Sequence, residues 1–445
     1  MASRASFQLE LAPHDVVSVV CSLLAHYRHE EFYAYEGEGS WYIGIGNHAS
    51  FVVDPSGRTA TVSIDARPKN HEVTSTVAEL ARQFVSQYAK FGSKVFGFAC
   101  FNYALQRRGL NYTPGKWPLI SLMVPSVEVE IRDGKAIIAG DKQRAEGIYE
   151  YLQDMQPFDE VASLFPIDLA VNGPQYLEIV RRAIAMIQEG RLSKVIASRP
   201  IRLPGLVDMV ATLLLGRRTL KPRRSFSLNQ GGFQATGFSP ELVVSVDGEK
   251  VVTEPLAGTR AYPKEEHGRA KLRAELASDP KEIVEHVISV KEAVAEMESS
   301  CAPHTSSIED FMSVKVRGSV QHLGSRVAGH LAPENDIWDA LDTMFPSITA
   351  SGIPKTEALK VIEELEDLPR ELYSGAVLMI DGARAFEATL ALRTIFQDAD
   401  HSWVQAGAGI TAQSSAEREL TETCEKLGSF APYVADGGHL NQFGS

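Results

Sequence analysis

The chain has 445 residues, of which 44% are hydrophobic and 23% are charged. This is the balance of a globular protein, and it excludes a disordered or fibrous chain. The 57 acidic and 44 basic residues give a formal net charge of −13. Because nonspecific nucleic-acid binding needs a basic surface, we expect no nucleic-acid partner.

The four cysteines, Cys21, Cys100, Cys301 and Cys424, form no CxxC pair and lie at no zinc-ligand spacing from a histidine. They are expected to be reduced thiols. The N-terminus has no apolar run of signal-peptide length, and no segment approaches the roughly 20 apolar residues of a membrane span. We therefore expect a cytoplasmic protein that does not contact a membrane.

The first part of the chain, residues 1–160, alternates strand and helix patterns. Short β-branched and aromatic runs predict separate strands at 41–46, 48–54 and 59–66 in an antiparallel meander. Apolar residues at helical spacing predict a helix at 73–91. Alternating residues on either side of Asp133-Gly134 predict a hairpin over 125–140.

A polar, proline-containing stretch at 156–175 predicts the boundary with a second part, residues 161–436. That part contains predicted helices at 176–190, 281–297 and 414–430, the last with Ser414 or Ser415 as N-cap. A strand is expected at 193–203 and a hairpin at 375–396, turned at Asp381-Gly382. Residues 437–445 are expected to be a loose tail. Antiparallel hairpins interrupted by long helices predict an α+β fold.

Two predicted helices carry acidic residues on one face. Glu282 and Glu285 are three residues apart in one helix, and Glu419 and Glu422 are three apart in the other, followed by Lys426. Carboxylate oxygens suit Mg²⁺, so two such helices could hold one ion between them. Solvated acidic helix faces are a commoner outcome of this spacing, and both interpretations stay open.

Two small-residue segments, Gly258–Arg260 and Gly407–Gly409, are read as turns that let backbone N–H groups approach an anion, although a plain tight turn fits as well. Lys194 lies in an apolar run. A surface lysine is the commoner reading there, whereas a buried amine could act as a general base. His322 is either a structural or a site histidine.

Taken together, these segments resemble the chorismate-utilising enzymes, a group that includes anthranilate, aminodeoxychorismate, isochorismate and salicylate synthases. The resemblance covers about residues 190–435. It is carried, in order, by KVIASR, TEPLAGTRA, SDPKEIVEH, RGSVQHLGS, FPSITASGIPK, LYSGAV, LALRT, QAGAGI and ERELTETCEKL. The sequences of these motifs are most similar to those of salicylate synthases. Lysine at position 194 is typical of members that add water, whereas ammonia-using members typically carry glutamine there.

The resemblance implies a fold of two large, mostly antiparallel sheets packed as a sandwich with helices outside. It implies that Lys194 is the general base that activates water and that Glu254 is the general acid for the leaving C4 hydroxyl. Glu285 and Glu422 are implied to bind Mg²⁺ directly, supported by Glu282 and Glu419. The implied substrate-binding residues are Gly258, Thr259, His322, Thr349, Tyr373, Arg393, Gly407, Ala408, Gly409 and Lys426.

The activity implied is Mg²⁺-dependent conversion of chorismate, through isochorismate, into salicylate and pyruvate. Siderophore biosynthesis is the usual destination of the product in this group. An enzyme that uses water needs no glutamine amidotransferase subunit, and a monomer is expected. Three alternatives remain: an isochorismate synthase that releases its product, an ammonia-using enzyme, and an inactive binding subunit.

Overall fold

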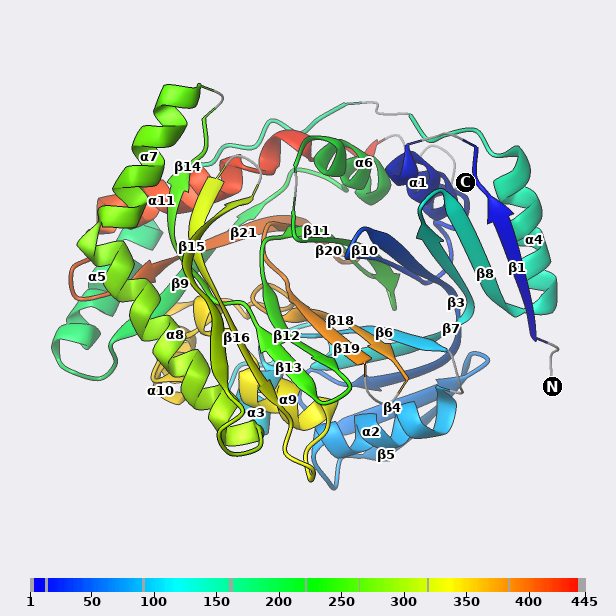
Figure 1. The fold of residues 1–445 in the computed structure, drawn as a ribbon, viewed down its shortest axis with the longest axis horizontal. Helices are drawn as coiled ribbons and strands as arrows, with labels where there is room; N and C mark the ends of the chain where they lie inside the picture. The colour runs from blue at the N-terminus through cyan, green and yellow to red at the C-terminus, as the bar shows by residue number, and fades with distance from the viewer. Residues whose placement is uncertain are drawn as a thin grey trace.

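The computed structural model describes residues 4–12, 15–89, 93–159, 163–220, 222–263, 265–317, 320–382 and 385–438. Every strand pairing in these ranges is antiparallel. The strands form two layers, with helices outside them (Figure 1). The predicted α+β class is confirmed.

The first layer pairs eleven strands side by side. They are, in spatial order, β1 (Arg4–Glu10), β8 (Lys135–Asp141), β7 (Ile120–Arg132), β3 (Ser40–Val53), β2 (Phe32–Gly37), β10 (Arg224–Gln230), β11 (Phe233–Ser239), β20 (Thr394–Gln397), β21 (Ser402–Ile410), β9 (Lys194–Arg202) and β17 (Gly352–Ile353).

Strands β3 and β7 also belong to the second layer. It runs β5 (Arg67–Glu72), β4 (Thr59–Ile64), β3, β7, β6 (Lys94–Ala99), β18 (Ala376–Asp381), β19 (Ala385–Leu390), β12 (Leu242–Asp247), β13 (Lys250–Thr253), β16 (Val320–His330) and β15 (Ser307–Arg317). Strand β14 (Leu256–Ala261) pairs with the first half of β16.

The two layers are continuous through β3 and β7. Residues 41–45 of β3 pair with β2, residues 49–53 pair with β4, and the register against β7 shifts between Asn47 and Ala49. The prediction of two separate strands at 41–46 and 48–54 was therefore wrong. Gly46, with φ of +70°, and Asn47 interrupt the alternation, but they mark a bulge that bends one strand rather than a turn that ends it.

An aromatic core fills the space between the layers. Tyr33, Phe226 and Phe396 come from the first layer and Phe96 and Phe98 from the second, and all are buried. Each fully buried aromatic side chain removes a large apolar surface from water, so this cluster fixes how the layers face one another.

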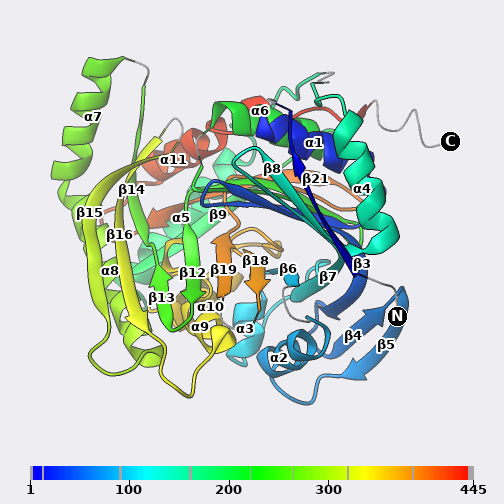
Figure 2. The same ribbon diagram turned by 45° about the vertical axis from the view of Figure 1, so that its right-hand side comes forward.

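Helices cover both outer faces (Figure 2). Over the first layer pack α1 (Val16–His26), α4 (Lys142–Asp154) and α6 (Met209–Thr219). A second apolar cluster holds α2 (Val77–Tyr88), α5 (Gly173–Gln188), α8 (Pro280–Ser300), α9 (Ile337–Met344) and α10 (Lys355–Leu365). Helix α11 (Ala416–Gly428) packs on β21, and α7 (Glu266–Ser278) packs on β14.

Most predicted elements are present with shifted ends. The Asp133-Gly134 turn joins β7 to β8 with positive φ at both residues, as a tight hairpin requires. Ser415 is the N-cap of α11, and its side chain accepts a hydrogen bond from the Arg418 N–H. The predicted hairpin at 375–396 is shorter, because β19 ends at Leu390 and β20 begins a new pairing at Thr394.

Two predicted features include residues that lie outside the described ranges. The boundary near residue 160 falls on 160–162, and residues 439–445 of the predicted tail also lie outside the described residues. Cys21, Cys100 and Cys301 are buried free thiols, and Cys424 is a partly buried one. No helix in the described ranges combines the length and apolarity that crossing a membrane requires.

Candidate active site

One cavity lies between strands β9, β14 and β21 and helices α8 and α11. The residues predicted for the site that line it are Lys194, Gly258, Thr259, Glu285, His322, Thr349, Tyr373, Arg393, Gly407, Gly409, Glu422 and Lys426. Four other predicted residues, Glu254, Glu282, Ala408 and Glu419, do not line it. The cavity therefore gathers residues from segments more than 200 positions apart.

Lys194 is a buried amine at the start of β9, with a side chain only 1% exposed. Its Nζ donates to Ser289 Oγ at 3.1 Å and lies 2.9 Å from Glu285 Oε1, both on α8. A lysine is rarely buried without an anionic partner, and Glu285 is that partner here. The surface interpretation of this residue is excluded, and the amine faces the cavity.

Glu241 is a cavity acid that the sequence interpretation missed. It sits between β11 and β12 and is 1% exposed. Burial raises its pKa to about 8, although the hydroxyls of Thr349 and Ser347 and the charge of Lys194 act against the rise. Ser347 donates to its Oε1 at 2.8 Å, while Oε2 has no hydrogen-bond partner among the described residues. At neutral pH this carboxyl group is mostly protonated and can donate a proton.

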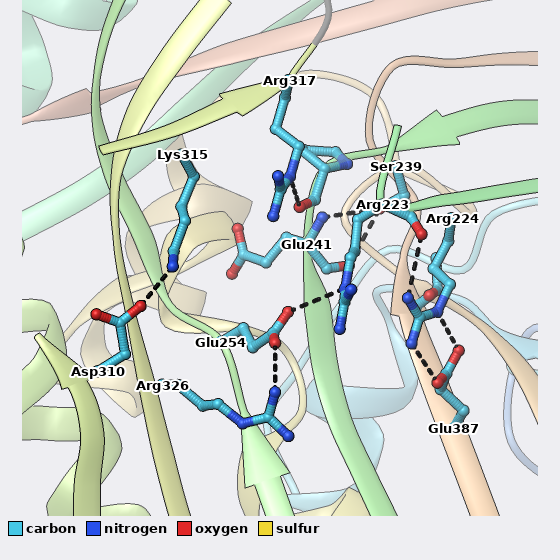
Figure 3. A network of polar contacts seen from close by, with 12 residues as sticks. Arg223, Arg224, Ser239, Glu241, Glu254, Asp310, Lys315, Arg317, Arg326 and Glu387 are labelled. Atoms are coloured by element: carbon cyan, nitrogen blue, oxygen red, sulfur yellow. Dashed lines mark hydrogen bonds and ion pairs between the residues drawn. The ribbon is translucent and has the colours of Figure 1, made fainter. Parts of the chain in front are cut away.

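Glu254 does not occupy the position expected for the general acid. It follows β13, and its carboxylate pairs with Arg326 Nη1 at 3.4 Å and Arg223 Nε at 3.6 Å. Figure 3 shows the carboxylate facing these two guanidinium groups. Glu254 is therefore engaged with two guanidinium groups. Of these two acids, Glu241 lines the cavity and Glu254 does not.

The four glutamates predicted to hold a metal are buried, and each has a cationic partner. Glu285 pairs with Lys194, as above, and Glu282 pairs with Arg260 at 2.8 Å. On α11, Glu422 pairs with Lys426 at 2.8 Å and Glu419 with Lys281 at 2.9 Å. The two acidic helix faces are thus not solvated surfaces. They face each other across the cavity wall, because Lys281 of α8 reaches Glu419 of α11.

The charges of these acids act on one another. Burial and repulsion from Glu422 raise the pKa of Glu419, whose Oε2 is buried without a hydrogen-bond partner in the described ranges. Burial also acts to raise the pKa of Glu422, but Lys426, Lys281 and Arg418 together outweigh it and the pKa is lowered. The two helices therefore concentrate negative charge in one place.

The donor set fits Mg²⁺ in chemistry, since it consists of carboxylates and one carboxylate oxygen is unpaired. Two glycines leave the acids room: a Cβ on Gly409 would lie 2.5 Å from Glu285 Oε1, and one on Gly258 would lie 2.8 Å from Glu282 Oε2. As the side chains stand, no three acidic, histidine or cysteine residues converge on a single point within the described part of the chain. Ammonium and guanidinium groups hold the carboxylates apart.

The opposite wall presents an unpaired guanidinium. Arg393 Nη2 donates to His322 Nε2 at 2.8 Å and Nη1 to the Arg317 carbonyl at 3.5 Å, and Arg393 makes no ion pair with a carboxylate among the described residues. Because Nε2 accepts, the neutral His322 ring carries its proton on Nδ1 and can donate to Thr259 Oγ1 at 3.0 Å.

Burial, with the nearby Arg393 and Lys426 charges, lowers the pKa of His322 far below 6.5. Burial, together with Arg317, lowers the pKa of Arg393 only to about 10, so it stays cationic at neutral pH.

The two glycine segments are strands, which corrects the prediction of turns. Gly407–Gly409 lies inside β21, paired with Ser198–Ile196 of β9, and Gly258 occupies a bulge in β14 with φ of +76°. Alternation along β21 puts Gly407 and Gly409 on the cavity wall and turns Ala408 away from it. The small residues leave space for the Lys194 and Glu285 side chains rather than presenting a loop to an anion.

The cavity has apolar walls that sequence reasoning also missed. Ile196, Leu256, Leu392 and Phe430 line it beside the charged groups, and Tyr373 adds a buried aromatic ring. An apolar ring bearing carboxylates is the kind of molecule that such walls and cations accommodate. Fold and cavity together define an α+β protein with a closed site for a small anionic molecule.

Comparison of the chain with known proteins agrees with this class and identifies the family. Residues 30–432 match the family described as chorismate binding enzyme. The chain belongs to the chorismate-binding enzyme family and acts on a small-molecule substrate.

Among curated relatives, the salicylate synthase of Mycolicibacterium paratuberculosis is 37% identical over 96% of this chain and 94% of its own length. Anthranilate synthase component 1 of Methanothermobacter thermautotrophicus is 31% identical over 79% of this chain and 77% of its own. Among solved structures, anthranilate synthase component I of Streptococcus pneumoniae shares the fold with a TM-score of 0.76 and 21% identity, over 89% of this chain and 92% of that one. The menaquinone-specific isochorismate synthase of Escherichia coli has a TM-score of 0.74 and 19% identity, over 97% and 95%.

Proposed function

We propose that this chain converts chorismate into salicylate and pyruvate through isochorismate, with Mg²⁺ as cofactor. The observation that carries the proposal is that a buried amine, Lys194, and a buried protonated acid, Glu241, line the same cavity. Exchange of a hydroxyl between ring positions needs one group that takes a proton from water and another that gives a proton to the leaving oxygen.

In the first stage, Lys194 must first lose the ammonium proton that pairs it with Glu285. The neutral amine then accepts a proton from water as the water oxygen forms a bond to C2 of the ring. Glu241 gives its proton to the C4 oxygen, which leaves as water, so the ring gains and loses one hydroxyl group. Hydroxide is a poor leaving group, and an acid that is still protonated at pH 7 removes that difficulty. Arg393 and Lys426 are the cations that would hold the carboxylates of the substrate.

The second stage moves the hydrogen on C2 to the methylene carbon of the enolpyruvyl group as the C3–O bond breaks. The ring becomes aromatic and pyruvate leaves, so no external acid or base is consumed. Such a step depends on holding the substrate in a reactive conformation, which the apolar walls of Leu256, Leu392 and Tyr373 would do.

Glu285 and Glu422 would hold the Mg²⁺ ion, with Glu282 and Glu419 behind them. When bound, the ion would neutralise a ring carboxylate in a wall that is otherwise acidic. The cations now paired with these glutamates would have to release them, so metal and substrate are expected to bind together.

Lysine at position 194 and the salicylate synthase relative favour a reaction with water, and two neighbouring folds belong to isochorismate synthases. Product identity tests the proposal. Chorismate and Mg²⁺ are incubated with the protein, and salicylate is measured by fluorescence and pyruvate with lactate dehydrogenase. Equal amounts of both are expected. Isochorismate without pyruvate would remove the second stage, and anthranilate formed on adding ammonium would overturn the proposal.

A further inference from the structure

A second cavity, of about 590 Å³, lies at the other end of β9 and β21. Alternation along β9 puts Lys194 and Ile196 in the catalytic cavity, and Ser198, Pro200 and Arg202 in the second one. The two cavities are therefore successive spaces along the same face of the same two strands. A volume of this size is in the range that holds a small organic molecule.

A hydrogen-bonded wall separates the two spaces. Gln405 lines both cavities and donates from Nε2 to Ser198 Oγ at 2.9 Å. The Ser198 N–H donates to Glu366 Oε1 at 2.7 Å, and Glu366 is held in turn by the buried Arg370 at 2.6 Å. Each group in this wall has a partner, so the second cavity is a compartment distinct from the catalytic site.

The second cavity contains a buried carboxylate oxygen without a partner. Asp398 follows β20 and is 6% exposed. Its Oδ1 accepts the backbone N–H groups of Asp400 at 2.9 Å and His401 at 3.0 Å, whereas Oδ2 accepts no hydrogen bond from any residue that the structure describes. A buried polar atom left unpaired is costly, and a ligand that donates to it would recover that cost.

A second acid lies close to Asp398. Burial raises the pKa of Glu371 and the charge of Asp398 adds to the rise, so the two carboxylates repel each other across the cavity. The Glu371 oxygens accept the backbone N–H groups of Lys116 and Trp117. The Lys116 ammonium pairs instead with Asp400, a side chain that is 61% exposed.

The basic side chains that line this cavity are directed mainly to other groups, although the His401 ring, which is charged only when protonated, lies 3.4 Å from Asp398 Oδ1. Arg199 directs its donors to Thr423, Cys424 and the carbonyl groups of Leu169 and Val171. Arg202 is exposed. Asp398 and Glu371 make one part of the wall acidic. The rest of the lining combines apolar and aromatic side chains, among them Tyr176, Ile179, Leu368 and Trp403, with polar and charged ones that include Lys116, Arg199 and Arg202.

We propose that this second cavity binds a small organic cation, with its ammonium group on Asp398 Oδ2 and its apolar ring against Trp403 and Tyr176. The acids select positive charge, and the aromatic walls select a flat apolar body. The proposal does not depend on the reaction assigned to the catalytic cavity.

Tryptamine, which joins an aromatic ring to a primary ammonium, is the probe. Isothermal titration of the full-length protein is expected to show saturable binding of one molecule that chorismate does not displace. Indole-3-propionate, in which a carboxylate replaces the amine, is expected not to bind. Absence of tryptamine binding, equal binding of both probes, or competition with chorismate would each overturn the proposal.

Asp398→Asn removes the charge without changing size and is expected to weaken tryptamine binding by about tenfold or more, since a charge-assisted hydrogen bond is lost. Asp154→Asn, at an exposed acid of α4 that lines neither cavity, is the matched control and should bind as wild type does. Leu368→Trp provides a second variant in case Asp398→Asn fails to fold, because this rim side chain is 65% exposed and can be enlarged without disturbing the core. Undiminished binding in either cavity variant would overturn the assignment.

Discussion

The catalytic cavity contains the same side chain, glutamate, in two opposite environments. On the α8–α11 side, Glu285 and Glu422 each lie against a lysine ammonium at 2.9 Å or closer. On the strand side, Glu241 is even more deeply buried but receives only a hydroxyl hydrogen bond. The pKa of Glu422 is lowered in the first environment, which favours a carboxylate, whereas the pKa of Glu241 is raised in the second, which favours a carboxylic acid.

This difference shows that burial alone does not determine the charge of an acid. Burial acts to raise the pKa on both sides, and the outcome depends on whether a cation is in contact. The ionised pair can become metal ligands, whereas the neutral acid can donate a proton. One cavity thereby combines an anionic wall with a proton donor, which is the division of roles that the proposed reaction needs.

The largest effect is expected from removing the acid. Glu241→Gln keeps the size of the side chain but cannot donate a proton to a leaving hydroxyl, so salicylate formation should fall by about 10³-fold. Steady-state rates with chorismate and Mg²⁺ measure this change. Glu254→Gln is the matched control and should retain most activity, and the opposite ranking of the two variants would restore Glu254 as the acid.

Lys194→Ala is expected to reduce water addition by about 10²-fold or more, since the base for water is lost. Binding of chorismate with Mg²⁺, measured by calorimetry, should persist because Glu422 and Arg393 are intact. A variant that retains wild-type turnover would show that the Lys194 amine only neutralises Glu285.

Glu422→Gln removes one negative charge from the proposed metal wall. The Mg²⁺ concentration needed for half-maximal activity should rise by about tenfold or more, because a hard cation loses an anionic ligand. A magnesium titration of the rate measures this shift. An unaltered Mg²⁺ requirement would place the metal away from the two helices.

A smaller effect is expected for Arg393→Lys. The ammonium keeps the charge but loses the guanidinium fork and its donation to His322, so KM for chorismate should rise by about tenfold with a lesser change in kcat. Initial-rate measurements over a range of chorismate concentrations separate the two constants. A loss confined to kcat would indicate that Arg393 acts on the transition state and does not anchor the substrate.

The smallest effect is expected on the stability of the fold, and the raised pKa of Glu241 determines its direction. The pKa of Glu241 is about 8 in the folded chain against 4.5 for an ordinary glutamate, so Glu241 binds its proton more tightly when the chain is folded. As pH rises from 4.5 to 8, the unfolded chain ionises first, so this group progressively destabilises the fold. Glu241→Gln should therefore raise Tm relative to wild type at pH 8 but not at pH 4.5, as calorimetry can show. A pH-independent difference would contradict the raised pKa.

Much of the fold follows from local patterns in the sequence. The Asp133-Gly134 turn, the periodicity of α8 and the Ser415 cap depend on neighbouring residues and were predicted. The bend in β3 was not, because a bulge depends on the partner strand β7 as much as on residues 46–48. The same reasoning explains why the Gly407–Gly409 strand was taken for a turn.

The family resemblance identified most of the cavity residues but not its acid. Glu254 lies within the motif TEPLAGTRA and was given the role, whereas Glu241 lies outside the motifs that carry the resemblance and was not considered. An acid next to proline between two apolar strands was the available signal. What the sequence does not show is the pairing of Glu254 with Arg223 and Arg326, residues 31 and 72 positions away.

The most direct test of the account is the charge of Glu241 in the free enzyme. Infrared difference spectroscopy of wild type against Glu241→Gln at pH 7 should show the C=O stretching band of a protonated carboxylic acid, and that band should fade as pH rises through about 8. A difference spectrum with only carboxylate bands at pH 7 would show that Glu241 is ionised and would contradict its role as proton donor.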